Sequence, residues 1–206
     1  MTFPDKAFQN IESFAQAYFD QLEIAWQSVD NDALKEAALV LGNAYDSRAT
    51  VYVCGNGGSA SIANHLSCDH LKGIQTDTNR RPRVISLSSN IEIITAVAND
   101  VAYDEIFTFQ LSTIANPGDI LITISSSGDS ENIVRAAQWA RSNKCSVIAM
   151  TGFEGGRSSH LAHINLHVDS DNYGVIEDTH QSLMHILAQF MRLQRMQDNL
   201  ISERKF

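Results

Sequence analysis

Short β-rich runs alternate with helical stretches over most of the chain, and this alternation constrains the fold more than any other feature. The β-rich runs lie at 51–54, 83–88, 119–125, 146–151 and 164–168. The helical stretches lie at about 59–72, 90–98, 104–115, 129–142 and 175–198. Near-continuous apolar strands separated by helices are typical of a parallel sheet covered on both faces. The sequence therefore predicts an α/β fold, a three-layer αβα sandwich around a five-stranded parallel sheet.

Two amphipathic helices are expected before the first strand. Apolar residues recur at spacings of three and four from Phe8 to Trp26 and again from Leu34 to Ala44, and turn and N-cap residues occupy 28–32 between them. We expect a single domain in which 1–48 form a helical hairpin used in oligomerisation, 49–198 the α/β core and 199–206 a frayed tail. One five-stranded sheet cannot bury all of these apolar stripes, so we expect a homo-oligomer.

Composition narrows the classes of function. The chain has 206 residues and a formal net charge of -9, which argues against direct nucleic-acid binding because that needs a basic footprint. Three cysteines without paired spacing fit a reducing compartment. Neither a signal peptide nor an apolar run of the roughly 18 residues needed to span a membrane is evident. We expect a cytoplasmic protein with no membrane partner.

Two segments have the same plan, in which a strand runs into serines and opens a helix. They are VYVCGNGGS at 51–59 and LITISSSGDS at 121–130. Each puts hydroxyls and backbone N–H groups at a helix N-terminus, where unpaired amides and the helix dipole favour an anion. Neither has the lysine of a P-loop, which argues against a nucleoside triphosphate. A neutral, hydroxyl-rich cradle predicts a small phosphorylated metabolite such as a sugar phosphate.

These two segments also fit two other interpretations. Gly55, Gly57 and Ala60 satisfy the G-x-G-x-x-A spacing of dinucleotide-binding folds. No acidic residue ends the next strand, however, and the chain is too short for a separate substrate domain, so we expect no nucleotide cofactor. The serines of 125–130 could also form a polar loop that merely caps a helix. Their place at the carboxyl end of a central strand, where α/β sheets bind ligands, favours binding.

Ligand-type side chains recur at helical spacing on two of the predicted helices. His65 and Asp69 stand four residues apart, and Glu177, Gln181 and His185 follow one another at the same interval. Pooled, they offer two imidazoles and two carboxylates, which suit Zn²⁺ or equally an acid–base pair. Histidines on helices are also common on surfaces and in hydrogen-bonded cores, so spacing alone leaves all three interpretations open.

The strings CGNGGS at 54–59 and ISSSGDS at 124–130, with the helix that carries His65 and Asp69, resemble the SIS (sugar isomerase) domain family, whose fold is flavodoxin-like. Within it the chain resembles the phosphoheptose isomerases, which convert sedoheptulose 7-phosphate to D-glycero-D-manno-heptose 7-phosphate. The likeness extends to the N-terminal helical pair, 98–100 and 150–156. It implies a ketose–aldose isomerase in heptose and surface-polysaccharide biosynthesis, and a homotetramer whose active sites are built from neighbouring subunits.

The resemblance also implies the site residues. Asp69, Glu177 and His185 are then the catalytic residues. A Zn²⁺ ion, one per subunit, is expected on His65, Asp69, Glu177 and His185. The phosphorylated sugar is expected on Asn56, Gly57, Gly58, Ser59, Asn99, Asp100, Ser125, Ser126, Ser127 and Ser130.

The chain departs from the family at three positions. Asp69 stands where these isomerases commonly have Glu, Glu177 where they commonly have Gln, and Ile74 where an arginine often follows. The alternatives are therefore an isomerase of another phosphosugar, a sugar-phosphate sensor, a lyase acting on an aminosugar phosphate, or a non-catalytic SIS protein of the DnaA-initiator-associating type. Ionisable clusters are costly to keep unless they are used, which favours an enzyme.

Overall fold

The computed structural model describes residues 2–206 and contains one sheet of five strands, all parallel, in the order β2-β1-β3-β4-β5. The strands are β1 Thr50–Gly55, β2 Arg83–Ser86, β3 Ile120–Ser125, β4 Ser146–Thr151 and β5 Ile164–His167. The predicted fold class and all five predicted strands are confirmed. Because β2 and β3 lie on opposite sides of β1, the strand order reverses between β1 and β3, which is where such sheets bind ligands.

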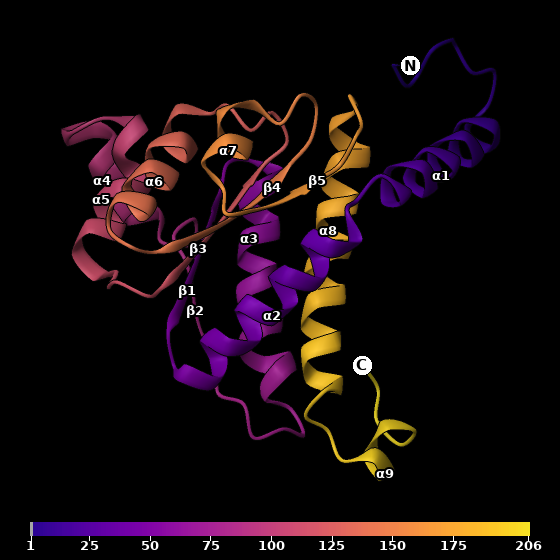
Figure 1. The fold of residues 1–206 in the computed structure, drawn as a ribbon. Coiled ribbons are helices and arrows are strands. Elements are labelled where there is room, and N and C mark those ends of the chain that lie inside the picture. The colour runs from indigo at the N-terminus through magenta and orange to yellow at the C-terminus, as the bar shows by residue number, and fades with distance from the viewer. Residues whose placement is uncertain (1) are drawn as a thin grey trace.

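Helices cover both faces of the sheet, as Figure 1 shows. One core contains Val51 and Val53 of β1, and the other contains Tyr52 and Cys54, because successive side chains of a strand point to opposite faces. On the first face lie α2 Asn31–Ser47, α3 Gly58–Cys68 and α8 Tyr173–Leu193. On the second lie α4 Ile91–Asp100, α5 Ile106–Ile114 and α6 Glu131–Ser142.

Both expected N-terminal helices are present, and both contact α8. In α1, Ile11–Gln27, the Tyr18 hydroxyl donates a 2.7 Å hydrogen bond to the Asp178 carboxylate on α8. Figure 1 shows α1 extending outward from the α/β body instead of lying along α2. Its Ile11, Phe19 and Ile24 are left exposed.

Several local features differ from the predicted helices. A π-helix, η1 Asp69–Gly73, follows α3 directly, and a 3₁₀ turn, η2 Tyr103–Glu105, precedes α5. A short helix that the sequence did not indicate, α7 Gly156–Leu161, covers the sheet beside α6. The last predicted helix is shorter than expected, ending at Leu193, and is followed by α9 Asp198–Ile201.

The C-terminal segment contacts the body of the protein. The Arg192 guanidinium donates a 3.0 Å hydrogen bond to the Lys205 carbonyl and lies 4.7 Å from the centre of the Phe206 ring. The expected frayed tail is thus exposed but attached to the end of α8. Among residues 2–206, no helix combines the length and the apolar character needed to cross a membrane.

Candidate active site

The first serine loop follows β1 and makes a tight turn into α3. Gly57 has a φ of 54°, and a Cβ on Gly55 would lie 2.6 Å from the Ser59 backbone, so glycine is required for this close approach. Ser59 is buried in the first turn of α3. The Gly57 cap supplies no side-chain hydrogen bond to the helix. The first amides of α3 are thus left for a ligand or water.

The second serine loop follows β3 and opens α6. The Ser125 hydroxyl accepts a 3.2 Å hydrogen bond from the Gly128 amide, and the Ser127 hydroxyl accepts one of 3.3 Å from the Asp129 amide. The Ser126 hydroxyl is buried without a hydrogen-bond partner among the described residues. Ser130 is the N-cap of α6, but its side chain caps no amide. Donors in this loop therefore stay available, as an anion site needs.

Two side-chain amides link the first loop to α6, where the strand order reverses between β1 and β3. The Asn56 side chain donates to the Asn132 carbonyl oxygen at 2.9 Å and accepts from its amide nitrogen at 3.0 Å. The Tyr103 hydroxyl also donates to the Asn56 oxygen, at 3.0 Å. The substrate contact expected of Asn56 stays a prediction; in the structure its side chain links the first loop to α6. Sequence reasoning did not find Asn132 or Tyr103, because no motif marks a contact made 76 or 47 residues away.

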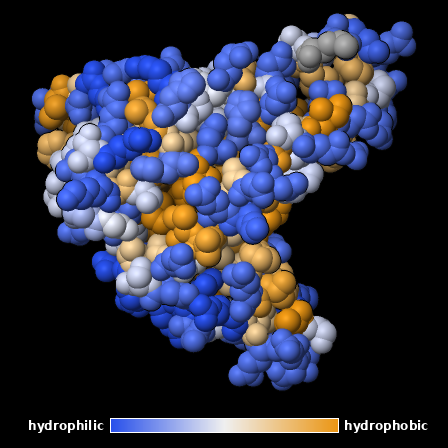
Figure 2. All heavy atoms as spheres, viewed as in Figure 1, coloured by the Kyte–Doolittle hydropathy of each residue, from blue (hydrophilic) through white to orange (hydrophobic). Residues whose placement is uncertain are grey.

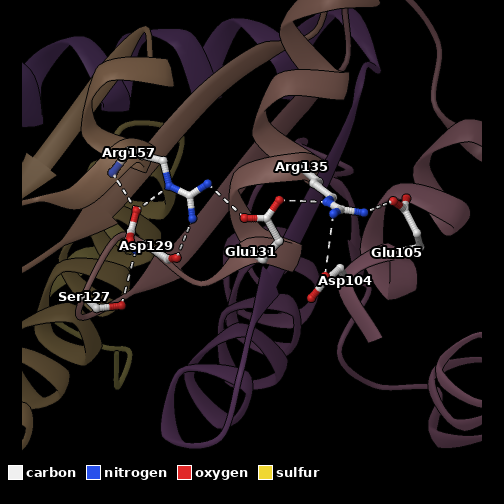
Figure 3. A network of polar contacts seen from close by, with 7 residues as sticks. All are labelled: Asp104, Glu105, Ser127, Asp129, Glu131, Arg135 and Arg157. Atoms are coloured by element: carbon white, nitrogen blue, oxygen red, sulfur yellow. Dashed lines mark hydrogen bonds and ion pairs between the residues drawn. The ribbon is translucent and has the colours of Figure 1, made fainter. Parts of the chain in front are cut away.

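Two carboxylates, one at the end of the second serine loop and one at the start of α6, are paired with arginines. The Arg157 guanidinium contacts Asp129 at 2.5 Å and Glu131 at 2.9 Å, and Arg135 contacts Glu131 at 2.8 Å. Hydrogen bonds from Arg157 hold the pKa of Asp129 below its usual range, and Arg135, with Arg157, does the same for Glu131. These arginines reduce the repulsion that the two carboxylates would exert on a phosphate. Figure 3 shows the whole network, whose members are Asp104, Glu105, Ser127, Asp129, Glu131, Arg135 and Arg157.

A His–Asp–His group lies between α3, η1 and α8. Asp69 Oδ1 is 3.5 Å from His65 Nε2, and Asp69 Oδ2 is 3.4 Å from His185 Nε2. One potential ligand atom from each of the three residues lies within 4.8 Å of the others. The Gln181 amide lies 2.8 Å from His65 Nδ1 and 3.2 Å from His185 Nε2. The structure thus brings together residues that are 116 to 120 positions apart in sequence.

Glu177 lies outside this group. Its carboxylate faces the N-terminus of α3, where a Cβ on Gly58 would collide with it. Burial, with a smaller contribution from the neighbouring Asp178 charge, raises the pKa of Glu177. Of the four residues expected to hold a metal, three are therefore close together and the fourth stands beside the first serine loop. Gln181, which shares the predicted stripe with Glu177 and His185, takes the place next to the histidines.

The remaining two predicted substrate residues lie at the end of α4. The Asn99 amide donates a 2.8 Å hydrogen bond to the Asp100 carboxylate, and both side chains are exposed. No described contact connects them to either serine loop.

A family model of the SIS domain matches residues 17–152. The chain belongs to the SIS domain family. A phosphoheptose isomerase from Colwellia psychrerythraea is 34% identical over 174 residues, which cover 83% of this chain and 88% of the relative. One from Shewanella denitrificans is 35% identical over 176 residues, covering 84% and 87%. The solved structure of a phosphoheptose isomerase from Francisella tularensis superposes with a TM-score of 0.82 at 32% identity, covering 90% of this chain and all of that one. Within the SIS family, the chain resembles phosphoheptose isomerases over most of its length.

Proposed function

We propose that this SIS-domain chain is a sedoheptulose 7-phosphate isomerase that forms D-glycero-D-manno-heptose 7-phosphate. The observation that carries the proposal is that one helix, α3, begins in the first serine loop and also carries part of the His–Asp–His group. α3 starts in the first serine loop and carries His65 six residues after Ser59, a rise of about 9 Å. A sugar phosphate with its phosphate on the cradle would therefore extend its other end along α3 toward the His–Asp–His group.

The two serine loops are proposed to hold the phosphate. Ser59, Ser125, Ser127 and Ser130 supply hydroxyls and, with Gly57, Gly58 and Ser126, backbone amides at two helix N-termini. The unpartnered Ser126 hydroxyl supports this assignment because a buried donor without a partner is costly unless a ligand uses it. Asn56 positions the first loop through Asn132, and Asn99 and Asp100 are proposed to contact the sugar only from a neighbouring subunit.

Glu177 is proposed as the base that moves the proton between C1 and C2 of the sugar. A carboxylate held by a metal is a poor base, and Glu177 lies outside the His–Asp–His group. The raised pKa of the Glu177 carboxylate makes it a stronger base than an ordinary glutamate. His185 is its proposed acid–base partner whenever no metal occupies the imidazole. Asp69 would hold the imidazoles of His65 and His185 in position through its two oxygens.

The His–Asp–His group fits a Zn²⁺ ion. Two imidazoles and one carboxylate match the three-ligand set of catalytic zinc sites, and their potential ligand atoms lie within 4.8 Å of one another. His65, Asp69 and His185 would hold the ion, and Glu177 would complete the family-type set only after its side chain moved. When bound, the ion would polarise the carbonyl or hydroxyl oxygens of the sugar.

We further propose that the chain forms a homo-oligomer and works in a reducing compartment. α1 exposes Ile11, Phe19 and Ile24, and Figure 2 shows hydrophobic surface where α2 and α8 meet. A groove of about 830 Å³ there is lined by apolar residues, among them Leu34, Leu39, Ile186 and Phe190, and by polar ones that include Asp46, Arg80 and Arg195. Such surfaces favour a homo-oligomer, proposed to be a tetramer. All three cysteines are free, which supports a cytoplasmic location.

A proton NMR assay with sedoheptulose 7-phosphate tests the activity, with EDTA and added Zn²⁺ as separate arms. We expect the aldose to appear, and turnover to fall with EDTA and return with Zn²⁺. Asp69→Asn, His185→Ala and Glu177→Ala should each lower kcat at least a hundredfold. His160→Ala, which changes an exposed histidine on α7, should leave it unchanged. Activity that survives EDTA would argue for the metal-free acid–base pair.

The alternative functions predict different results in this assay. A SIS protein of the DnaA-initiator-associating type would bind initiator molecules and leave the sugar unchanged, whereas another phosphosugar isomerase would turn over a different ketose phosphate. Absence of turnover in every metal arm, with intact fold and oligomer, would overturn the proposed reaction.

A further inference from the structure

A second cavity, which is polar and has a volume of about 400 Å³, lies at the amino ends of β1 and β2, away from both serine loops. Arg48 caps the C-terminus of α2 two residues before β1, and Arg80 and Arg81 come just before β2. Arg195 reaches the cavity from beyond the end of α8. We call it the arginine pocket, and its lining residues are Tyr45, Asp46, Arg48, Asn79, Arg80, Arg81 and Arg195. In a chain of net charge -9 with 15 basic residues, four arginines around one cavity are a pronounced local excess of positive charge.

One carboxylate serves two of these arginines. Arg80 is buried, and its Nε and Nη2 contact the two Asp46 oxygens at 3.0 and 3.2 Å. Arg195 Nη2 contacts the same carboxylate at 2.5 Å. The two arginines hold the pKa of Asp46 below its usual range, and the hydrogen bond from Arg80 has the larger effect, so the carboxylate stays ionised. The single carboxylate of the pocket is therefore already shared by two of its four arginines.

The other two arginines lack an acidic partner among residues 2–206. Arg81 Nη1 donates only to the backbone carbonyls of Thr78 and Arg80, at 3.0 and 2.7 Å. The Arg48 guanidinium makes no described hydrogen bond or ion pair, although its backbone carbonyl accepts from Arg83. With Asp46 as the only carboxylate of the lining, the pocket has a net positive charge. Positive groups that line one cavity repel one another and attract an anion.

We propose that the arginine pocket binds a small polyvalent oxyanion, such as a phosphate compound or a polycarboxylate. The planar guanidinium fork matches both groups with paired hydrogen bonds. The cavity volume is within the range of small-molecule sites, and the Asn79 and Tyr45 side chains add polar and aromatic walls. This site is separate from the serine cradle, which lies at the carboxyl ends of the strands and relies on hydroxyls and amides.

Isothermal titration at low ionic strength tests the proposal, with pyrophosphate and tricarballylate as separate probes for the two ligand chemistries. The full chain is compared with Arg48→Gln/Arg81→Gln, in which both unpaired guanidiniums are removed and the buried Arg80–Asp46 pair is kept. Arg141→Gln is the matched control, because Arg141 is exposed and donates only to the Leu161 carbonyl. Arg48→Lys/Arg81→Lys keeps the charge and removes the forks.

We expect the Gln double variant to lose at least tenfold in affinity for one of the two probes, and the Lys variant to lose part of it. The Arg141→Gln control should bind as the unmodified chain does, and isomerase turnover should be unchanged in all variants. Equal binding by the Gln double variant would overturn the proposal. So would an equal loss in the Arg141→Gln control, which would indicate general charge attraction. A change of oligomeric state in the Gln double variant, seen by light scattering, would assign the arginines to a subunit interface instead.

Discussion

The Tyr45 hydroxyl lies 2.5 Å from Nδ1 of His70, and both side chains are buried. The contact joins α2 to the π-helix that starts at Asp69. His70 is the residue after Asp69, so this hydrogen bond fixes the turn that presents the Asp69 carboxylate to His65 and His185. π-helical turns are rare in proteins, and those that do occur are frequently found at functional sites.

Removing this hydroxyl should destabilise the fold. Tyr45→Phe leaves His70 Nδ1 buried without its partner, which costs about 1–3 kcal/mol in the free energy of unfolding. Urea denaturation followed by circular dichroism measures the change. Tyr173→Phe, on an exposed tyrosine, is the control and should have no effect. Equal stability of the two variants would show that the buried hydrogen bond contributes nothing.

A methyl group at Gly58 should impair turnover without unfolding the protein. The added Cβ would collide with the Glu177 carboxylate, which is the movable end of a side chain, so the carboxylate shifts and the backbone need not. We expect kcat to fall at least tenfold in Gly58→Ala. Gly73→Ala adds the same group where no atom lies within 4 Å, and it should retain full activity. Wild-type kcat in Gly58→Ala would argue against Glu177 as the base.

Stability should decrease as the pH falls below neutrality. Burial lowers the pKa of His180 to about 4, and its Nε2 lies 3.2 Å from the Thr151 carbonyl. Between the unfolded pKa of about 6.5 and this folded value, the unfolded chain binds a proton that the folded chain does not, so acid favours unfolding. Burial lowers the pKa of His70 in the same direction, again to about 4. The raised pKa of Glu177 acts in the opposite sense.

Urea titrations at pH 7.5, 6.0 and 5.0 measure this effect. Each buried histidine contributes a loss of at most about 1.4 kcal/mol per pH unit within the window. The pKa values of Asp46, Asp129 and Glu131 are lowered, so the stability that these carboxylates provide is lost only at more acidic pH. A free energy of unfolding that stays constant from pH 7.5 to 5.0 would contradict the prediction.

Gly128→Ala should disrupt the second serine loop. Gly128 has a φ of 64°, and an added Cβ would collide with the Gly155 carbonyl, which is backbone and cannot easily move. The control is Gly118→Ala, where φ is 94° but no atom lies within 4 Å, so only conformational strain is added. Such strain costs about 1–3 kcal/mol, and Gly128→Ala should lose more than the control. The apparent KM for the phosphosugar should also rise in Gly128→Ala alone.

Local patterns predicted much of this molecule. The five strands appeared as apolar runs because both faces of a parallel sheet are buried, and the helices between them as periodic stripes. The serine loops were found because glycine and serine at the end of a strand have a distinct chemistry. The helix α7 was missed because six residues are too few to show a helical period.

The His–Asp–His group was only partly accessible from sequence. Spacing of four residues predicted that His65 and Asp69 share a face, and likewise Glu177, Gln181 and His185. Spacing cannot rank residues along such a stripe by their distance from another helix. The packing of α8 against α3 places Gln181 and His185 beside His65, and Glu177 one turn earlier beside Gly58.

The sequence by itself determined the fold class, the two serine loops and the set of ionisable residues, because each depends on neighbours within a few positions. Tertiary structure alone decided that Glu177 stands apart from Asp69, that Asn56 is bound to Asn132, and that Arg48, Arg80, Arg81 and Arg195 surround one cavity. These relationships depend on how helices distant in sequence pack on the sheet. That packing is set by the shapes of many side chains at once, which no short pattern records.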